Sequence, residues 1–165
     1  MINDTSIEGE ILLVVEGEEA PNFTLKSDEK RDISLSDYIG KKVVLYFYPK
    51  DGTPGCTNEA KAFRDAIKDF EKKNAIILGV SKDSVESHQK FKRKHELPFT
   101  LLSDPEGEVL SLYGVWKQKS MFGKTFMGIE RTTFLLDEYG VVQKIYRKVR
   151  VKDHAQACLL DLTQT

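Results

Sequence analysis

Cys56 is the residue of this chain whose surroundings are best suited to chemistry. It stands where an apolar run ending at Tyr48 gives way to an amphipathic stretch that begins near Pro54. In open α/β sheets, ligands bind where a strand ends and a helix begins. If Thr53 caps the helix and Pro54 is its first residue, Cys56 takes the third position of the first turn. The free N–H groups and the helix dipole stabilise an anion there, so we expect a nucleophilic thiolate.

The two cysteines of the chain receive different interpretations. A lone cysteine is commonly a small buried side chain. For Cys56 the sequence favours the nucleophile instead, because a Pro-Gly and Thr-Asn turn flanks it rather than an obvious apolar stripe. Cys158 shares a helical face with Ala155, Leu159 and Leu162. We therefore expect Cys158 to pack in the core.

The apolar pattern predicts the strands that must position Cys56. Nearly continuous apolar runs at 43–48, 75–80 and 133–136 are typical of strands covered on both faces. Residues 141–146 follow the turn signal Asp137-Glu138-Tyr139-Gly140, so they should form an antiparallel hairpin with the strand before them. The predicted sheet is therefore mixed.

Helical patterns alternate with these strands. The first helix contains Ala60, Phe63, Ile67 and Phe70 at spacings of three, four and three. A second follows Asp83-Ser84 and runs to about residue 95, a third extends from the capping signal at 103–106 to 114, and a fourth spans 152–162. Residues 116–127 are predicted as a loop that covers the core or forms a flap, dimer surface or reductase docking site. The alternation predicts one three-layer α/β domain over residues 1–165.

The pattern Pro49-x-x-x-Thr53-x-x-Cys56 lies inside VVLYFYPKDGTPGCTNEA, and a second segment, GIERTTFLL, carries Arg131. Together they resemble the peroxiredoxins, specifically the bacterioferritin comigratory protein or Q-type subgroup. The resemblance covers about residues 16–162 and leaves 1–15 as an extra N-terminal segment. It implies a thioredoxin-like fold and a thiol peroxidase. Such an enzyme reduces hydrogen peroxide and organic hydroperoxides through a Cys56 sulfenic acid.

The resemblance also implies roles for three further residues. The Thr53 hydroxyl and the Arg131 guanidinium would hold the two peroxide oxygens and stabilise the charge that grows on the leaving one. Arg131 would also favour the thiolate, and Pro49 would shield the sulfur from bulk water. The predicted catalytic set is therefore Cys56, Thr53, Arg131 and Pro49. Glu59 matches a family position but stays outside this set, because helix electrostatics alone favours an acid in the first turn.

The chain departs from the subgroup at the second cysteine. Many members carry a resolving cysteine five residues after the first, where this chain has Lys61. Others carry it in the helix that corresponds to 83–95, which contains none here. Two interpretations stay open: a one-cysteine enzyme reduced by an external thiol such as thioredoxin or glutaredoxin, or a disulfide between Cys56 and Cys158. The first is simpler, because Cys158 is expected in the core.

Composition and charge limit the other functions. The chain has 25 Lys+Arg against 26 Asp+Glu, and this balance argues against a nucleic-acid partner. The apolar run 11–15 is far too short for a membrane span, and no secretory signal is present, so we expect a cytoplasmic protein. His88, His95 and His154 lack metal-ligand spacing, so we expect surface or capping roles for them and neither a metal site nor a cofactor. The oligomeric state we expect is a monomer or weak homodimer.

Two other functions use a similar reactive thiol. A thiol-disulfide oxidoreductase of the thioredoxin type needs Cys-x-x-Cys, and residue 59 is a glutamate. A redox sensor or chaperone would use the same thiol without turnover. Stoichiometric oxidation of Cys56 in the presence of excess reductant would favour that alternative.

Overall fold

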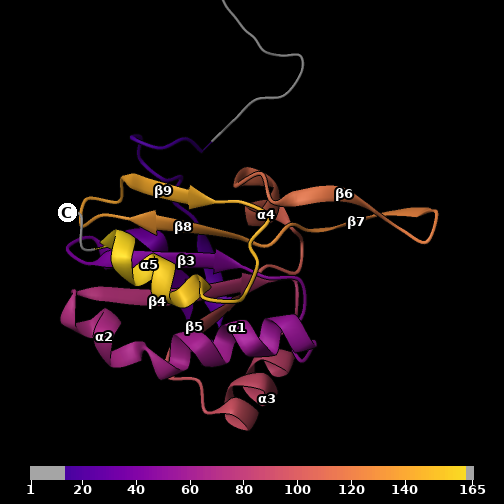
Figure 1. The fold of residues 1–165 in the computed structure, drawn as a ribbon, viewed down its shortest axis with the longest axis horizontal. Coiled ribbons are helices and arrows are strands. Elements are labelled where there is room, and N and C mark those ends of the chain that lie inside the picture. The colour runs from indigo at the N-terminus through magenta and orange to yellow at the C-terminus, as the bar shows by residue number, and fades with distance from the viewer. Residues whose placement is uncertain (1–13, 163–165) are drawn as a thin grey trace, which may run out of the picture.

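A mixed sheet forms the centre of the molecule (Figure 1). The computed structural model describes residues 14–162, and within them seven strands run in the order β2-β1-β5-β4-β3-β8-β9. β3 pairs in parallel with β4 and antiparallel with β8, which itself pairs antiparallel with β9. The predicted mixed sheet and its hairpin are confirmed. The strands are β1 (Thr24–Ser27), β2 (Asp32–Ser34), β3 (Lys42–Phe47), β4 (Ala75–Ser81), β5 (Thr100–Ser103), β8 (Thr132–Leu136) and β9 (Val142–Tyr146).

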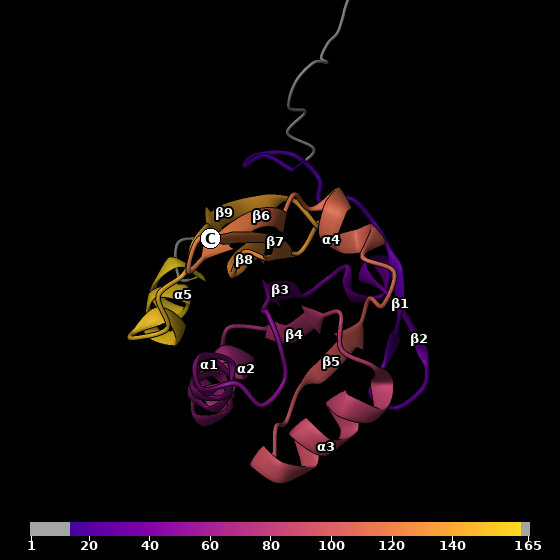
Figure 2. The same ribbon diagram turned by 90° about the vertical axis from the view of Figure 1, so that its right-hand side faces the viewer.

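Helices cover both faces of this sheet (Figure 2). Residues of α1, α2, α3 and α5 pack against one face, while α4, the short 3-10 helix η2 and residues near the N-terminus pack against the other. This is the predicted three-layer α/β arrangement. The helices are η2 (Leu35–Tyr38), α1 (Pro54–Asp65), α2 (Ile67–Lys72), α3 (Val85–His95), α4 (Glu108–Leu112) and α5 (His154–Leu162).

β3 divides the core into two halves. Val44 and Tyr46 face the α1 side, whereas Val43, Leu45 and Phe47 face the α4 side. This alternation follows from the two-residue period of a strand. Because both faces are covered, β3 is a nearly unbroken apolar run. It ends at Phe47, and the loop that follows leads to Cys56.

The first predicted helix is interrupted. α1 ends at Asp65 and α2 begins at Ile67, with Ala66 (φ −101°, ψ 8°) as the residue between them. The apolar stripe survives the break, because Phe63 and Phe70 are both buried with ring centroids 5.8 Å apart. The stripe was therefore predicted correctly, but its continuity as one helix was not.

The third predicted helix starts later than expected. Gly107, at φ 74°, is the N-cap residue of α4, and Pro105 lies in the turn before it. The Asp104 carboxylate still accepts a hydrogen bond from the Leu110 N–H at 2.8 Å. Asp104 therefore does accept a hydrogen bond from an N–H of the first helical turn, as a capping residue would. It lies three residues before the N-cap residue Gly107, however, rather than at the N-cap itself.

The predicted loop at 116–127 is a β-hairpin, formed by β6 (Trp116–Met121) and β7 (Lys124–Ile129). Phe122 and Gly123 make the turn at φ 54° and 78°, a conformation for which the sequence lacks the usual Asn-Gly signal. The Phe122 side chain is 94% exposed, so it does not cover the core. Figure 1 shows the hairpin projecting from the sheet edge at which α1 begins.

The short strands β1, β2 and β5 of the central sheet were also not predicted from the sequence.

His154 is buried at the start of α5, contrary to the surface role expected from the sequence. Its Nε2 lies 2.9 Å from Thr133 Oγ1 and 3.6 Å from the sulfur of Cys158, which is buried as predicted. Burial, with a further contribution from the Arg131 charge, lowers the pKa of His154 to about 4. The imidazole is therefore neutral in the folded protein at neutral pH.

His154 should make the protein less stable in weak acid. An unfolded chain protonates histidine near pH 6.5, whereas the folded chain resists protonation until about pH 4. The stabilisation is therefore fully present above pH 6.5 and is lost as the pH falls toward 4. We expect His154→Gln to remove on the order of 2 kcal/mol of the stability difference between about pH 4.5 and pH 7. Urea unfolding of both proteins at the two pH values measures this, and equal pH dependence would contradict it.

Candidate active site

Cys56 lies in the first turn of α1, directly after the loop that leaves β3. Thr53 is the N-cap residue with extended backbone (φ −76°, ψ 155°), and Pro54 opens the helix, as the sequence predicts. Cys56 is only 1% exposed, however. Its spacing to Ala60 and Phe63 places all three on the inward face of α1. The sequence interpretation that Cys56 stands off the apolar stripe is therefore wrong, and the sulfur is both buried and part of the core surface.

Sheet pairing brings Arg131 to this sulfur. Because β8 runs antiparallel to β3 with Thr132 opposite Phe47, Arg131 lies at the same sheet edge as the start of the Cys56 loop. Its Nη1 and Nη2 atoms each donate a hydrogen bond to Cys56 Sγ at 3.5 Å. The Arg131 carbonyl accepts a hydrogen bond from Val149 at 3.0 Å, which fixes the backbone behind the guanidinium. The sulfur therefore faces a nearly buried, firmly held cation.

Glu59 shares this cation. Arg131 Nη1 donates to Glu59 Oε1 at 2.7 Å, and the Glu59 side chain is 1% exposed. Burial raises the pKa of Glu59 to about 7, although the neighbouring Arg131 acts to lower it. Burial alone would lower the pKa of Arg131, but Glu59 and Cys56 outweigh it and raise that pKa. Glu59 was not among the predicted catalytic residues, although its spacing of three residues from Cys56 indicates that both lie on one helix face.

Two buried polar atoms beside this group have no hydrogen-bond partner among the described residues. They are Glu59 Oε2 and the hydroxyl of Tyr46, a β3 residue packed on Phe63. Burial raises the pKa of Tyr46 well above its ordinary value, and the nearby charges of Glu59 and Cys56 add to this. The phenol therefore stays neutral, and Cys56 packs within the same buried apolar cluster as Tyr46 and Phe63.

The other two predicted residues lie in the loop before α1. The Thr53 hydroxyl donates to the Lys50 carbonyl oxygen at 2.8 Å, so its hydrogen is already committed. What Thr53 offers a ligand is an oxygen lone pair, which accepts a hydrogen bond. Pro49 is partly buried and lies two residues after the end of β3. In the described part of the chain, Arg131 is the hydrogen-bond partner of the Cys56 sulfur, and the roles of Thr53 and Pro49 stay predictions.

Cys158 differs from Cys56 in its electrostatic surroundings. It is a free, buried cysteine on α5. Burial, reinforced by the carboxylates of Glu59 and Asp161, raises the pKa of the Cys158 thiol. A protonated thiol is a poor nucleophile and a poor resolving group. The structure thus gives Cys56 a cationic partner, whereas Cys158 lies 3.6 Å from the neutral His154 ring and near two carboxylates.

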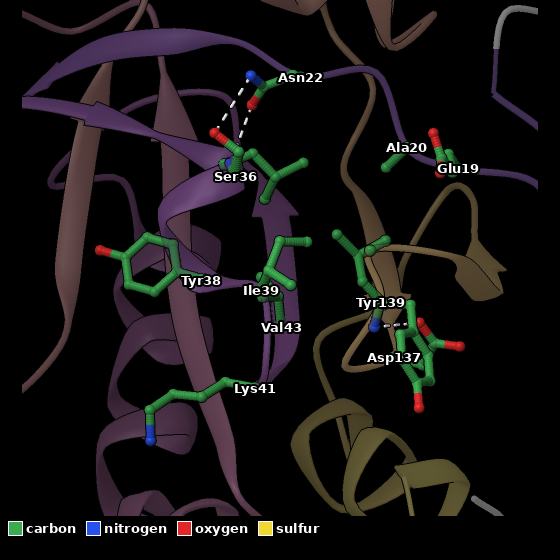
Figure 3. Close-up of a pocket in the computed structure, with 13 residues that line it drawn as sticks. Glu19, Ala20, Asn22, Ser36, Tyr38, Ile39, Lys41, Val43, Asp137 and Tyr139 are labelled. Atoms are coloured by element: carbon green, nitrogen blue, oxygen red, sulfur yellow. Dashed lines mark hydrogen bonds between the residues drawn. The ribbon is translucent and has the colours of Figure 1, made fainter.

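Other hollows and clusters lie away from this sulfur. A groove at the opposite sheet edge runs between η2 and the β8–β9 turn, with Ile39 and Tyr139 on its two sides (Figure 3). None of the residues that line it is a cysteine, histidine or arginine. Asp51, Asp83 and His88 bring potential ligand atoms within 4.8 Å of one another, but these atoms already bond to protein groups. None of the helices described between residues 14 and 162 has the length and apolar character needed to cross a membrane.

Comparison with known proteins agrees with this geometry. Residues 16–145 match the AhpC/TSA family. Peroxiredoxin Bcp of Bacillus subtilis is 54% identical over 146 residues, which cover 88% of this chain and 93% of the relative. The solved bacterioferritin comigratory protein of Xanthomonas campestris, described for alkyl peroxide reduction, is 42% identical with a TM-score of 0.82, covering 86% of this chain and 90% of that one.

A second solved structure extends the likeness over more of the chain. PrxQ of Xylella fastidiosa is 37% identical with a TM-score of 0.87, and the match covers 92% of this chain and 96% of that one. The fold that these structures share is the thioredoxin fold, which the sequence analysis expected. With a cysteine at the mouth of a helix, an arginine on its sulfur and a family match over most of its length, the chain belongs to the AhpC/TSA family, among the peroxiredoxins of Bcp and Q type.

Proposed function

We propose that this chain is a one-cysteine thiol peroxidase in which Cys56 attacks hydrogen peroxide and organic hydroperoxides. The observation that carries the proposal is the pair of 3.5 Å contacts from the Arg131 guanidinium to the Cys56 sulfur. A thiolate in a buried site loses its hydration, and an adjacent cation compensates for that loss. The helix N-terminus adds to the same stabilisation. The relatives are thiol peroxidases, which agrees with this chemistry.

The reaction proceeds in two parts. The Cys56 thiolate attacks one peroxide oxygen, the O–O bond breaks, and the leaving oxygen departs as hydroxide or alkoxide and takes a proton. Arg131 stabilises the charge as it moves from sulfur to the leaving oxygen. The Thr53 oxygen accepts a hydrogen bond from the peroxide O–H, and Pro49 limits the access of water. Cys56 is left as a sulfenic acid, the first step of thiol oxidation.

An external thiol completes the cycle. Its sulfur attacks the sulfenic acid sulfur, displaces water and forms a mixed disulfide with Cys56. A second thiol then attacks the mixed disulfide, which releases Cys56 and joins the two reductant sulfurs in a disulfide. The protonated, buried thiol of Cys158 supports an external resolver over an internal one. Thioredoxin and glutaredoxin are the reductants that we propose. We further propose a single domain over residues 1–165, a cytoplasmic location, and a monomer or weak homodimer.

Oxidation with one equivalent of hydrogen peroxide distinguishes the two possible fates of Cys56. We expect intact-mass spectrometry to show a gain of one oxygen atom, because the sulfenic acid has no internal thiol to capture it. Further oxygens should follow with excess peroxide. Cys158→Ser should keep this gain and the turnover with dithiothreitol, and Cys56→Ser should lose both. Loss of two hydrogens in the wild type, absent from Cys158→Ser, would instead establish a Cys56–Cys158 disulfide.

Removal of the cation should slow peroxide reduction far more than removal of the carboxylate beside it. Arg131→Met takes away the charge on the sulfur, and we expect the second-order rate constant with hydrogen peroxide to fall about 100-fold or more. Glu59→Gln keeps an acceptor for Arg131 Nη1 but removes a competing negative charge, so we expect less than about a tenfold change. Stopped-flow or competition kinetics measure both constants. A wild-type rate in Arg131→Met would refute the proposed role of the guanidinium.

A further inference from the structure

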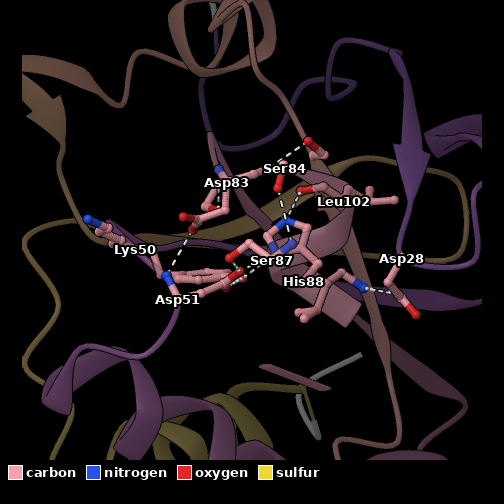
Figure 4. Close-up of polar contacts among 12 residues, drawn as sticks. Asp28, Lys50, Asp51, Asp83, Ser84, Ser87, His88 and Leu102 are labelled. Carbon is pink, nitrogen blue, oxygen red and sulfur yellow. Dashed lines mark hydrogen bonds and ion pairs between the residues drawn. The ribbon is translucent and has the colours of Figure 1, made fainter. Parts of the chain in front are cut away.

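The loop that carries Thr53 is held by a buried polar cluster on the α3 side (Figure 4). Asp51, two residues before Thr53, has a side chain only 5% exposed. Its Oδ1 accepts from the Tyr48 hydroxyl at 2.6 Å, and its Oδ2 accepts from the Ser87 hydroxyl at 2.8 Å. Nδ1 of His88 lies 2.7 Å from the same Oδ2. The loop carboxylate is thus bound by Tyr48, the residue that follows β3, and by two residues of α3.

His88 connects this carboxylate to the sheet. The side chain is fully buried, although the sequence suggested a surface or capping role. Nε2 lies 3.0 Å from the Leu102 carbonyl oxygen, which only accepts hydrogen bonds, so Nε2 donates. On the other side of the ring, Nδ1 lies 2.7 Å from Asp51 Oδ2, an oxygen that also accepts a hydrogen bond from the Ser87 hydroxyl. His88 therefore bridges β5 and the active-site loop through both nitrogens.

One peptide group links the cluster to Thr53. The Asp51 N–H donates to Asp83 Oδ2 at 2.8 Å, and Asp83 Oδ2 also accepts from the Ser81 hydroxyl at 2.6 Å. The carbonyl of that same peptide belongs to Lys50, and it accepts the Thr53 hydroxyl at 2.8 Å. Because a trans peptide is planar, its N–H and C=O point in opposite directions. When Asp51 is held in place, the Lys50 carbonyl has a fixed direction. That carbonyl in turn fixes the orientation of the Thr53 hydroxyl, which donates to it.

We propose that His88 and Asp51 are positioning residues for peroxide reduction. They hold the Lys50–Asp51 peptide plane, and through it the Thr53 oxygen, in the orientation that receives the peroxide beside the Cys56 sulfur. The inference rests on the peroxidase function proposed above. A buried polar network of this kind is by itself weak evidence for a gain in folding stability. We therefore assign the cluster a role in orienting Thr53.

Two substitutions of His88 separate positioning from stability. In His88→Asn the amide nitrogen stands near Nδ1 and keeps the donor to Asp51, but the contact with Leu102 is lost. His88→Gln places its amide near Nε2, which keeps the Leu102 contact and loses the Asp51 donor. Each variant removes one buried hydrogen bond, so the two should lose similar thermal stability. If the cluster positions Thr53, only His88→Gln should be slow with peroxide.

The experiment compares two reactions of Cys56 in the wild type and both variants. The rate constant for oxidation by hydrogen peroxide should fall about tenfold in His88→Gln and stay within about threefold of the wild type in His88→Asn. Alkylation by iodoacetamide, which needs the thiolate but not Thr53, should be unchanged in both. Asp51→Asn replaces one carboxylate oxygen by an amide nitrogen, so Tyr48, Ser87 and His88 cannot all keep their present contacts with it, and it should reproduce His88→Gln if that variant does not fold.

Three results would overturn the inference: a wild-type peroxide rate in His88→Gln, an equal loss in both His88 variants, or a parallel loss of peroxide and alkylation rates. The wild-type protein serves as the reference for the proposed function. If wild-type Cys56 does not react with peroxide, the peroxidase proposal itself fails. If it does react and His88→Gln matches it, only the positioning role fails.

Discussion

The contact between the Arg131 guanidinium and the Cys56 sulfur is the interaction on which the site depends. Cys56 is only 1% exposed, so water can do little to solvate a charge that develops on its sulfur, and the guanidinium lies where it can stabilise such a charge. The cation in turn needs a partner, and the Glu59 carboxylate provides it at 2.7 Å. Because the pKa of Glu59 lies at about 7, the carboxyl group holds only part of its charge at neutral pH. One guanidinium therefore serves both groups, with Nη1 contacting Glu59 and both Nη atoms contacting the sulfur.

Sheet architecture makes this contact possible. Arg131 and Cys56 are 75 residues apart, yet the antiparallel pairing of β8 with β3 brings both to one edge of the sheet. β3 is buried on both faces, so its end cannot shift without disturbing two halves of the core. Cys56 therefore follows a strand that is buried on both faces, whereas Thr53 lies in the loop between that strand and α1.

That loop obtains its order from polar contacts. The Asp51 carboxylate is bound by Tyr48, which directly follows β3, and by His88 of α3, while the Asp51 N–H donates to Asp83. Apolar packing resists compression but fixes direction poorly, whereas hydrogen bonds fix the orientation of a peptide plane. The site thus combines an apolar inner wall beneath the sulfur with a hydrogen-bonded loop above it. His88 of α3 connects this loop to the sheet, because it contacts both the Asp51 carboxylate and the Leu102 carbonyl of β5.

The sequence predicted much of this protein. The apolar runs at 43–48, 75–80 and 133–136 were correctly interpreted as central strands because such runs reflect burial on both faces, a local property of the chain. The capping pattern at Thr53-Pro54 placed Cys56 in the first helical turn for the same local reason. The hairpin at 116–129 was missed because its turn uses Phe122-Gly123 in a left-handed conformation that no residue pattern announced.

By itself, therefore, the sequence determined the family resemblance, the strand-to-helix turn that carries Cys56 and the absence of a second cysteine near it in the chain. Only the tertiary structure decided that Cys56 is buried, that Glu59 shares Arg131 with it, and that His88 and His154 lie in the interior. The physical reason is that burial and ion pairing depend on contacts between elements far apart in the chain. Spacing along one helix or strand cannot specify which side chain of another element will occupy the space that it faces.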